Sequence, residues 1–177
     1  KSKETWLREY IISYFENIEH FSYSSVTKVP YDFLTKNIIK KPYSSTAMDF
    51  GTNVHNALEK IVLDKAKLED YTDEDELKAI KNGLNRLEEI KKENPGFKIK
   101  TSEMHVKVPI KLLTEYSQED SLMFKGFIDA VFEHDDGIFL VDYKTDKNAN
   151  YASHHKRQLA VYKKIYSQLE NIPEEKI

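Results

Sequence analysis

The chain has 177 residues, of which 40% are hydrophobic and 32% are charged, with a formal net charge of -3 and no cysteine. This length can bury the core of one domain, and the composition is globular rather than disordered. The absence of cysteine excludes disulfides, a thiol nucleophile and cysteine-ligated zinc or iron–sulfur sites. The slight acidity argues against a protein that only coats nucleic acid, but an enzyme with a local basic groove is compatible with it.

The sequence has no apolar run of membrane-spanning length and no signal-peptide layout, which predicts an intracellular protein without membrane contact. The first residue is Lys1 rather than Met, and residues 171–177 have the composition of a turn that leads onward. We therefore expect a fragment of a larger protein. It would consist of an N-terminal helical segment over residues 1–45, packed on a core over residues 46–177 that is truncated at its C-terminus.

The first half of the chain has the periodicity of helices. Apolar side chains recur every three or four positions in four stretches, over residues 6–18, 26–38, 47–65 and 77–87. Pro30 lies near the start of the second stretch, where proline is tolerated. Thr72 and Asp75 resemble a capping box for the fourth helix, and the run Asn94-Pro95-Gly96 would end it.

The second half begins with alternating apolar and polar residues, which predict strands. The alternating segments cover residues 103–110, 122–132 and 138–144, and a hairpin turn at residues 134–137 joins the last two. A final helix is predicted roughly over residues 151–169. Helices, an antiparallel three-strand meander and a closing helix indicate an α+β plan.

The hairpin places three charged side chains on one face. Asp142 and Lys144 are two residues apart in a strand and therefore point the same way. A turn made of residues 135–136 places Asp129 directly opposite Asp142, whereas a turn made of residues 136–137 places it opposite Lys144. In both registers the three side chains share a face, with Cβ atoms about 5 Å apart when opposed and roughly 7–8 Å apart when diagonal.

Two carboxylates that face each other repel, unless one takes up a proton or a cation binds between them. A divalent ion would form a hard, oxygen-rich site suited to Mg²⁺ or Mn²⁺. Lys144 could then orient or deprotonate a water, or neutralise charge on a phosphate. The alternative is a solvated hairpin face on which Asp142 and Lys144 form a salt bridge. Strand geometry alone leaves both open.

Four short motifs resemble those of one nuclease family. The G-F-I-D run of residues 126–129 and the L-V-D-Y-K-T run of residues 140–145 resemble the D…(D/E)XK signature of the PD-(D/E)XK nuclease superfamily. Its RecB-like branch also carries a G-x-x-x-H motif on an upstream helix, matched by residues 51–55. A Q-x-x-x-Y motif on the following helix is matched by residues 158–162. The order and the types of element agree over roughly residues 46–169.

The resemblance implies a restriction-endonuclease-like α/β core with a central mixed sheet flanked by helices. It also implies three side chains and one backbone carbonyl as metal ligands, those of His55, Asp129, Asp142 and Tyr143. Lys144 would be the catalytic lysine. Gln158 and Tyr162, one helical turn apart, would order the site and contact the phosphate or a metal-bound water. The implied reaction is hydrolysis of DNA phosphodiester bonds with Mg²⁺ or Mn²⁺.

Further charged residues near these motifs could support the site. Glu59 lies one turn after His55, and Glu103 lies on the first strand, so either could assist or ligate the metal. His155, Lys156 and Arg157 begin the last helix, where a helix N-terminus beside a phosphodiester site favours contact with the DNA backbone. For each of these residues, a solvated surface charge is the alternative.

Because cysteine is absent, the RecB-like nucleases that hold an iron–sulfur cluster are disfavoured. The resemblance then implies the C-terminal nuclease domain of a superfamily 1 (UvrD/Rep-type) helicase-nuclease in DNA repair or end processing. Its partners would be a helicase motor and single-stranded DNA or duplex ends, in the cytoplasm near the nucleoid. A stand-alone RecB-like exonuclease and a catalytically inactive DNA-binding or scaffolding domain of the same fold are the alternatives.

Overall fold

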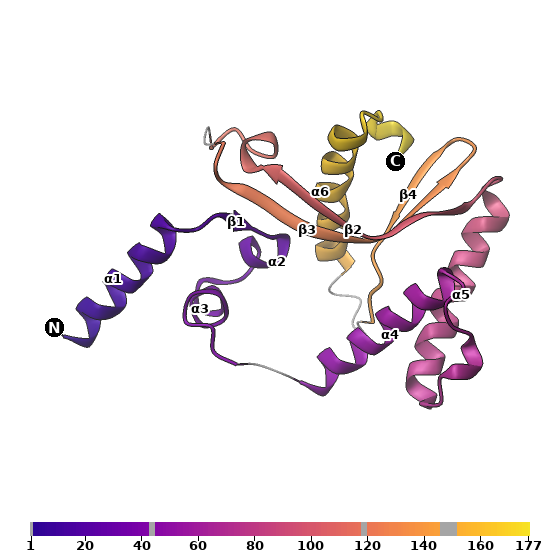
Figure 1. Ribbon diagram of the computed structural model, residues 1–177, viewed down its shortest axis with the longest axis horizontal. Helices are drawn as coiled ribbons and strands as arrows, with labels where there is room; N and C mark the ends of the chain where they lie inside the picture. The colour runs from indigo at the N-terminus through magenta and orange to yellow at the C-terminus, as the bar shows by residue number, and fades with distance from the viewer. Residues whose placement is uncertain (1, 43–44, 118–119, 146–151) are drawn as a thin grey trace. The chain divides into compact units, whose positions relative to one another are not determined.

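The computed structural model of the protein describes residues 2–42, 45–117, 120–145 and 152–177. Figure 1 shows the order of helices and strands along these residues. The helical segments are α1 (Lys3–Glu16), α2 (Tyr23–Val26), α3 (Pro30–Phe33), η1 (Leu34–Ile38), α4 (Thr46–Val62), η2 (Leu68–Asp70), α5 (Glu74–Glu93), η3 (Ile110–Leu112), α6 (Ala152–Glu170) and η5 (Glu174–Lys176). The strands are β1 (His20–Phe21), β2 (Lys98–Pro109), β3 (Met123–His134) and β4 (Gly137–Val141).

The chain divides into two compact units. One comprises Lys1–Tyr43 and Val106–Gly126, and the other comprises Ser44–His105 and Phe127–Ile177. The strands β2 and β3 contribute residues to both units. The site residues proposed from the sequence all belong to the second unit, so the site is described within that unit. The predicted division of the chain at residue 45 stays a prediction.

The first unit contains a strand that was not predicted. β1 pairs in parallel with β3, with His20 opposite Met123 and Phe21 opposite Phe124. Two residues are too few to show an alternating pattern, which is why the sequence did not reveal this strand. The helix α1 was predicted from its apolar spacing, yet none of its residues is buried.

The sheet is mixed, with β3 at its centre. β3 pairs with β1, β2 and β4, and its pairing with β4 is antiparallel. The consecutive strands β2, β3 and β4 are therefore neighbours, as in the predicted meander. This arrangement confirms the predicted α/β class with a mixed sheet and flanking helices. β2 begins at Lys98, five residues before the predicted start, because the alternation of apolar and polar side chains is irregular in that stretch.

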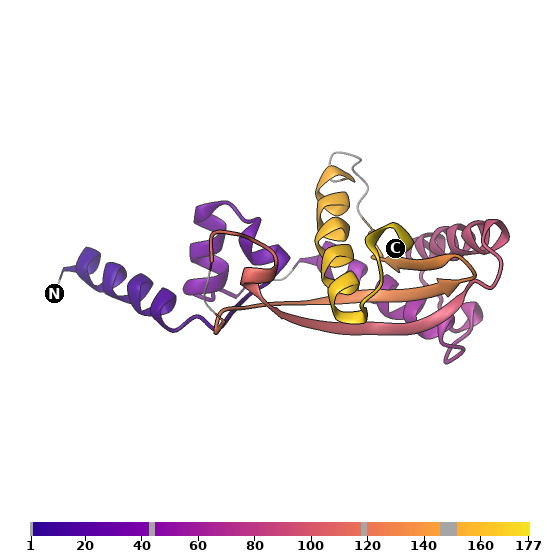
Figure 2. The same cartoon turned by 90° about the horizontal axis from the view of Figure 1, so that it is seen from above.

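Apolar packing holds the motif-bearing helices against the hairpin of the second unit. α4 and α5 share a buried cluster made of Val54, Ala57, Leu58 and Ile80. A second cluster joins α5 to β3 through Leu87, Ala130 and Phe132. α6 contacts β4, and Figure 2 shows this helix crossing one side of the strands. The two helices that carry sequence motifs, α4 and α6, are thereby fixed relative to the hairpin.

The boundaries of α5 follow from local backbone chemistry. The Asp73 carboxylate caps the helix by accepting the Glu76 N–H at 2.9 Å. The predicted cap at Thr72 is therefore wrong by one position, since Thr and Asp are adjacent and both can cap. The helix ends as predicted, at Asn94, and Gly96 follows with a φ of +74°, a conformation that glycine adopts without strain.

Within the described ranges, no helix combines the length and the apolar character that a membrane span needs.

Candidate active site

The hairpin register places the two aspartates opposite each other. The pairs His134 with Gly137 and Ala130 with Val141 show that the turn consists of residues 135–136. Continuing this register by one position brings Asp129 opposite Asp142. The structure therefore selects the first of the two registers that the sequence left open.

The end of β4 is determined by the Asp129 carboxylate. Asp129 Oδ2 accepts the backbone N–H of Tyr143 at 2.7 Å. A side-chain oxygen thus takes the amide that a continuing ladder would use, and the strand stops at Val141 instead of extending to residue 144 as predicted. The segment after Val141 leaves the sheet with Asp142 and Lys144 close to Asp129.

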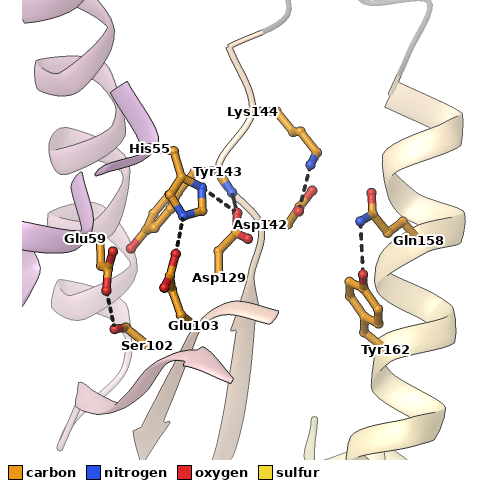
Figure 3. A network of polar contacts seen from close by, with 10 residues as sticks. All are labelled: His55, Glu59, Ser102, Glu103, Asp129, Asp142, Tyr143, Lys144, Gln158 and Tyr162. Carbon is orange, nitrogen blue, oxygen red and sulfur yellow. Dashed lines mark hydrogen bonds and ion pairs between the residues drawn. The ribbon is translucent and has the colours of Figure 1, made fainter. Parts of the chain in front are cut away.

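The histidine half of the site consists of His55, Glu59, Ser102, Glu103 and Asp129 (Figure 3). His55 Nδ1 lies 3.3 Å from Asp129 Oδ2, and its Nε2 lies 3.7 Å from Glu103 Oε1. The hydrogen bond with Asp129 raises the pKa of His55, burial lowers it, and the charges of Asp129, Glu103 and Glu59 raise it further. The imidazole is thus surrounded by acceptors, the setting in which a cation would replace its proton.

The glycine of the G-x-x-x-H motif allows a close approach one turn before His55. A Cβ atom at Gly51 would lie 3.2 Å from Thr145 Oγ1, which is tighter than ordinary van der Waals contact. Glycine therefore lets the segment that follows β4 approach α4. This proximity gives a physical reason for a glycine at this position of the motif.

Two successive residues of β2 both reach α4. The Ser102 hydroxyl donates to Glu59 Oε1 at 2.9 Å, and Glu103 faces His55. In a regular strand these side chains would point to opposite faces. Glu103 has a φ of +46°, in the left-handed region that non-glycine residues seldom adopt. This local change of backbone conformation lets Ser102 and Glu103 both face α4.

The lysine half of the site consists of Asp142, Lys144, Gln158 and Tyr162 (Figure 3). Lys144 Nζ donates to Asp142 Oδ1 at 2.8 Å. The Asp142 side chain is 5% exposed, whereas that of Lys144 is 35% exposed. The second oxygen of Asp142, Oδ2, is buried and has no hydrogen-bond partner within the described part of the chain. The salt bridge between Asp142 and Lys144 is therefore present, as expected for a solvated hairpin face, but its carboxylate is buried.

The surroundings of Asp142 oppose its negative charge. Burial raises the pKa of Asp142, the hydrogen bond and charge of Lys144 lower it, and the charge of Asp129 raises it again. An ionised carboxylate with an unpaired buried oxygen is costly. A cation bound at that oxygen would offset the cost, so the donor set fits a hard divalent ion.

Gln158 and Tyr162 face each other on α6, as their spacing predicted. Gln158 Nε2 lies 3.5 Å from the Tyr162 hydroxyl, at the outer limit of a hydrogen bond. The Tyr162 side chain is buried, and burial raises its pKa. The charges of Asp142 and Lys144 both act on this hydroxyl, which shows that it lies near them. It can serve as a neutral donor or acceptor beside the ion pair.

The geometry brings some of the proposed metal ligands together more closely than others. Ligands on adjacent positions of octahedral Mg²⁺ are about 3.0 Å apart, given bonds of about 2.1 Å. His55 and Asp129 approach this separation at 3.3 Å. Among the described residues, His55, Glu59 and Glu103 also offer ligand atoms within 4.8 Å of one another. The Asp142 carboxylate faces Lys144 instead (Figure 3).

The remaining sequence candidates lie at the start of α6. Lys156 and Arg157 are exposed, and Arg157 Nε donates to the Ser153 carbonyl of the same helix. The charge of His155 lowers the pKa of Asp142, so this histidine lies near the lysine half. Sequence reasoning missed Ser102, whose bond with Glu59 spans distant parts of the chain and leaves no local signal.

Comparison with known proteins identifies the family of the chain. The family model of the PD-(D/E)XK nuclease superfamily matches residues 20–176. Two proteins described as subunits of an ATP-dependent helicase/nuclease, from Thermoanaerobacter sp. (strain X514) and Thermoanaerobacter pseudethanolicus, are each 27% identical over 170 residues. Each match covers 81% of this chain and 14% of the relative. A protein of the same description from Clostridium novyi (strain NT) is 27% identical over 106 residues, which cover 57% of this chain and 8% of that relative.

This chain therefore spans a small part of the length of these relatives. The family match extends over most of the chain and includes all four motifs and the residues of both halves of the site. The chain belongs to the PD-(D/E)XK nuclease superfamily.

Proposed function

We propose that this chain is a metal-dependent deoxyribonuclease that hydrolyses DNA phosphodiester bonds with Mg²⁺ or Mn²⁺. The observation that carries the proposal is the buried Asp142 carboxylate, which has one oxygen paired with Lys144 and the other without a partner among the described residues. A structural ion pair gains nothing from an unpaired buried oxygen. A site that binds a cation beside a phosphate, in contrast, needs a carboxylate oxygen that is not already paired within the protein.

The residues that would hold the metal are His55, Asp129 and Asp142, with the backbone carbonyl of Tyr143. Glu103 and Glu59 lie close enough to His55 to take part. The bound ion would polarise the phosphate and lower the pKa of its water. Asp129 is also anchored by the Tyr143 amide, which keeps its carboxylate facing His55.

Lys144 and Tyr162 would act on the phosphate from the other side. Lys144 is a third exposed, so its ammonium can reach a substrate while it keeps its bond with Asp142. The positive charge would offset the charge that develops on the phosphate oxygens. Tyr162 stays neutral because burial raises its pKa, and its hydroxyl can hold a phosphate oxygen or a water, oriented by Gln158.

The relatives described as helicase/nuclease subunits support a cellular context for this activity. We propose that the domain works as the nuclease module of a superfamily 1 helicase-nuclease in DNA repair or end processing. The helicase motor would supply the DNA strand. The Lys156 and Arg157 side chains, exposed at the start of α6, would contact the DNA backbone together with His155.

The test is a cleavage assay on end-labelled single-stranded and duplex DNA with Mg²⁺, Mn²⁺ or EDTA. We expect metal-dependent cleavage that is lost in Asp142→Asn and Lys144→Ala. Glu133→Gln is the matched control, because Glu133 is a carboxylate paired with a lysine, Lys98, at 3.0 Å elsewhere on the same unit. The control should cleave like the unmodified chain. Absence of metal-dependent cleavage, or cleavage that survives both substitutions, would refute the proposal.

A further inference from the structure

A hollow of about 780 Å³ adjoins the lysine half of the site. One wall is the segment from Val141 to Thr145, which includes Asp142 and Lys144. The facing wall is formed by α5, and Phe50 of α4 contributes an aromatic side chain. A volume of this order is typical of ligand sites, which measure about 300–1,000 Å³. A ligand in this hollow would contact the segment that carries Asp142 and Lys144, two residues of the proposed reaction centre.

The wall formed by α5 carries a regular polar row. Lys78, Asn82 and Arg86 are each four residues apart, so they lie one above another on the same helix face, and all three line the hollow. Across eight residues the helix rises about 12 Å. One nucleotide of a B-form strand rises about 3.4 Å. Lys78 and Arg86 can therefore bind different phosphates of one strand.

The two cations of this row are available to an anionic ligand. The Lys78 side chain is exposed, and it has no ion pair or hydrogen bond with the described residues. Arg86 pairs with Glu89 at 2.9 Å, but the side chains are 72% and 60% exposed. Exposed pairs of this kind contribute little, so Arg86 can exchange Glu89 for a phosphate. Asp75 also lines the hollow and is its acidic side chain on α5.

The other lining residues favour a single strand over a duplex. Phe50 is half-buried and lines the hollow beside the apolar Val54 and Leu58. Unpaired bases present their flat faces to aromatic side chains, whereas the bases of a duplex are stacked on one another. A cationic row in the same hollow as an apolar, aromatic surface is the combination that holds a single strand by its backbone and its bases.

We propose that this hollow binds the segment of single-stranded DNA next to the scissile phosphate. Lys78 and Arg86 contact successive parts of its backbone, Asn82 donates between them, and Phe50 contacts a base. The inference rests on the proposed nuclease function, because it takes Asp142 and Lys144 as the place where the strand is cut. It assigns a strand-binding role to α5, a helix that carries none of the four family motifs.

The test compares two double variants of α5. Lys78→Ala with Arg86→Ala removes the row, and Lys81→Ala with Lys91→Ala is the matched control. Lys81 and Lys91 do not line the hollow, and Lys91 pairs with Glu88 at 3.8 Å, as Arg86 pairs with Glu89. Binding of labelled oligo(dT) is measured by fluorescence anisotropy in EDTA at several salt concentrations. EDTA prevents cleavage during the measurement.

We expect the first variant to bind oligo(dT) more weakly and with a shallower salt dependence. Each lost phosphate contact on a single strand reduces the slope of log Kd against log salt by about 0.7, so the slope should fall by about 1.4. The control should keep the slope of the unmodified chain. Both variants should melt at the same temperature, since all four side chains are exposed.

A third variant, Phe50→Leu, separates base contact from charge. It should weaken oligo(dT) binding at least about 5-fold without changing the salt slope, because stacking on an aromatic ring contributes about 1–3 kcal/mol per base. If the unmodified chain cleaves DNA with metal but Lys78→Ala with Arg86→Ala leaves the salt slope unchanged, the strand site is refuted and the nuclease proposal stands. If the unmodified chain does not cleave at all, the nuclease proposal itself fails.

Discussion

The two halves of the site balance their charges differently. In the histidine half, the His55 ring lies between two carboxylates, and Asp129 is further anchored by the Tyr143 amide. In the lysine half, Asp142 is 5% exposed, yet one of its oxygens has no partner in the part of the chain that the structure describes. The first half is satisfied by the protein itself. The second half carries a cost that a proton or a bound cation would relieve, which distinguishes Asp142 from Asp129.

The largest expected effect is that of Asp142→Asn, which should reduce the cleavage rate without reducing the stability of the fold. Burial raises the pKa of Asp142, so its contribution to folding is full below the ordinary pKa of aspartate and is lost as the pH rises through the raised value. At neutral pH the ionised group therefore opposes folding. We expect Asp142→Asn to reduce cleavage by more than about 100-fold, beyond the range of residues that only orient a ligand.

The same variant should melt at an equal or higher temperature at pH 7, and its advantage should shrink as the pH falls. Differential scanning calorimetry between pH 4 and pH 8 measures this, together with steady-state cleavage rates. A large loss of melting temperature at pH 7 would contradict the comparison, because it would show that Asp142 stabilises the fold as the histidine half does.

A bound metal ion should supply the partner that the buried oxygen of Asp142 lacks, and it should thereby stabilise the fold. A ligand at 100 times its Kd stabilises the folded state by about 2.7 kcal/mol, which for a domain of this size raises Tm by about 5–10 °C. We expect Mn²⁺ at such an excess to produce this rise in the unmodified chain and little rise in Asp142→Asn. Glu133→Gln should respond like the unmodified chain. An equal rise in Asp142→Asn would place the ion in the histidine half alone.

The smallest expected effect concerns Glu103, whose strained backbone belongs to the histidine half. Glu103→Gly relieves the left-handed conformation and should stabilise the fold by up to about 1 kcal/mol, while it removes the carboxylate that faces His55. Glu103→Gln keeps the strain and loses only the charge. Both should weaken metal affinity by about 10-fold or more.

Thermal melting and Mn²⁺ titration of the two variants give the comparison. We expect Glu103→Gly to be the more stable of the two, with similar metal affinity in both. Equal melting temperatures would show that the positive φ carries no strain. Unchanged metal affinity would show that Glu103 does not support the histidine.

The sequence predicted what depends on local periodicity. The sequence predicted that Asp142 and Lys144 lie side by side, and the hydrogen bond between them agrees with that expectation, although the predicted strand ends at Val141. The spacing of Gln158 and Tyr162 likewise predicted side chains in contact on one helix. These relations involve residues a few positions apart, for which backbone geometry is nearly independent of the rest of the fold.

What the sequence could not predict depends on contacts between distant segments. The pairing of β1 with β3 and the bond between Ser102 and Glu59 have no local pattern. The hairpin register stayed open until the structure showed the pairing. A glutamate at a positive φ is hidden for another reason, because only glycine, and to a lesser degree asparagine or aspartate, signals that conformation in a sequence. The assignment of metal ligands stays a prediction.

Asp129 has two structural roles, because its Oδ2 accepts the Tyr143 N–H and also faces His55. The first contact lies where β4 ends, and the second presents a carboxylate to the histidine. Asp142 terminates nothing, and at neutral pH its ionised form weighs against folding. A descendant of this domain that gave up catalysis would therefore gain by losing Asp142 and would be penalised for losing Asp129. In inactive relatives that keep the fold, we therefore expect Asp142 to be substituted more often than Asp129.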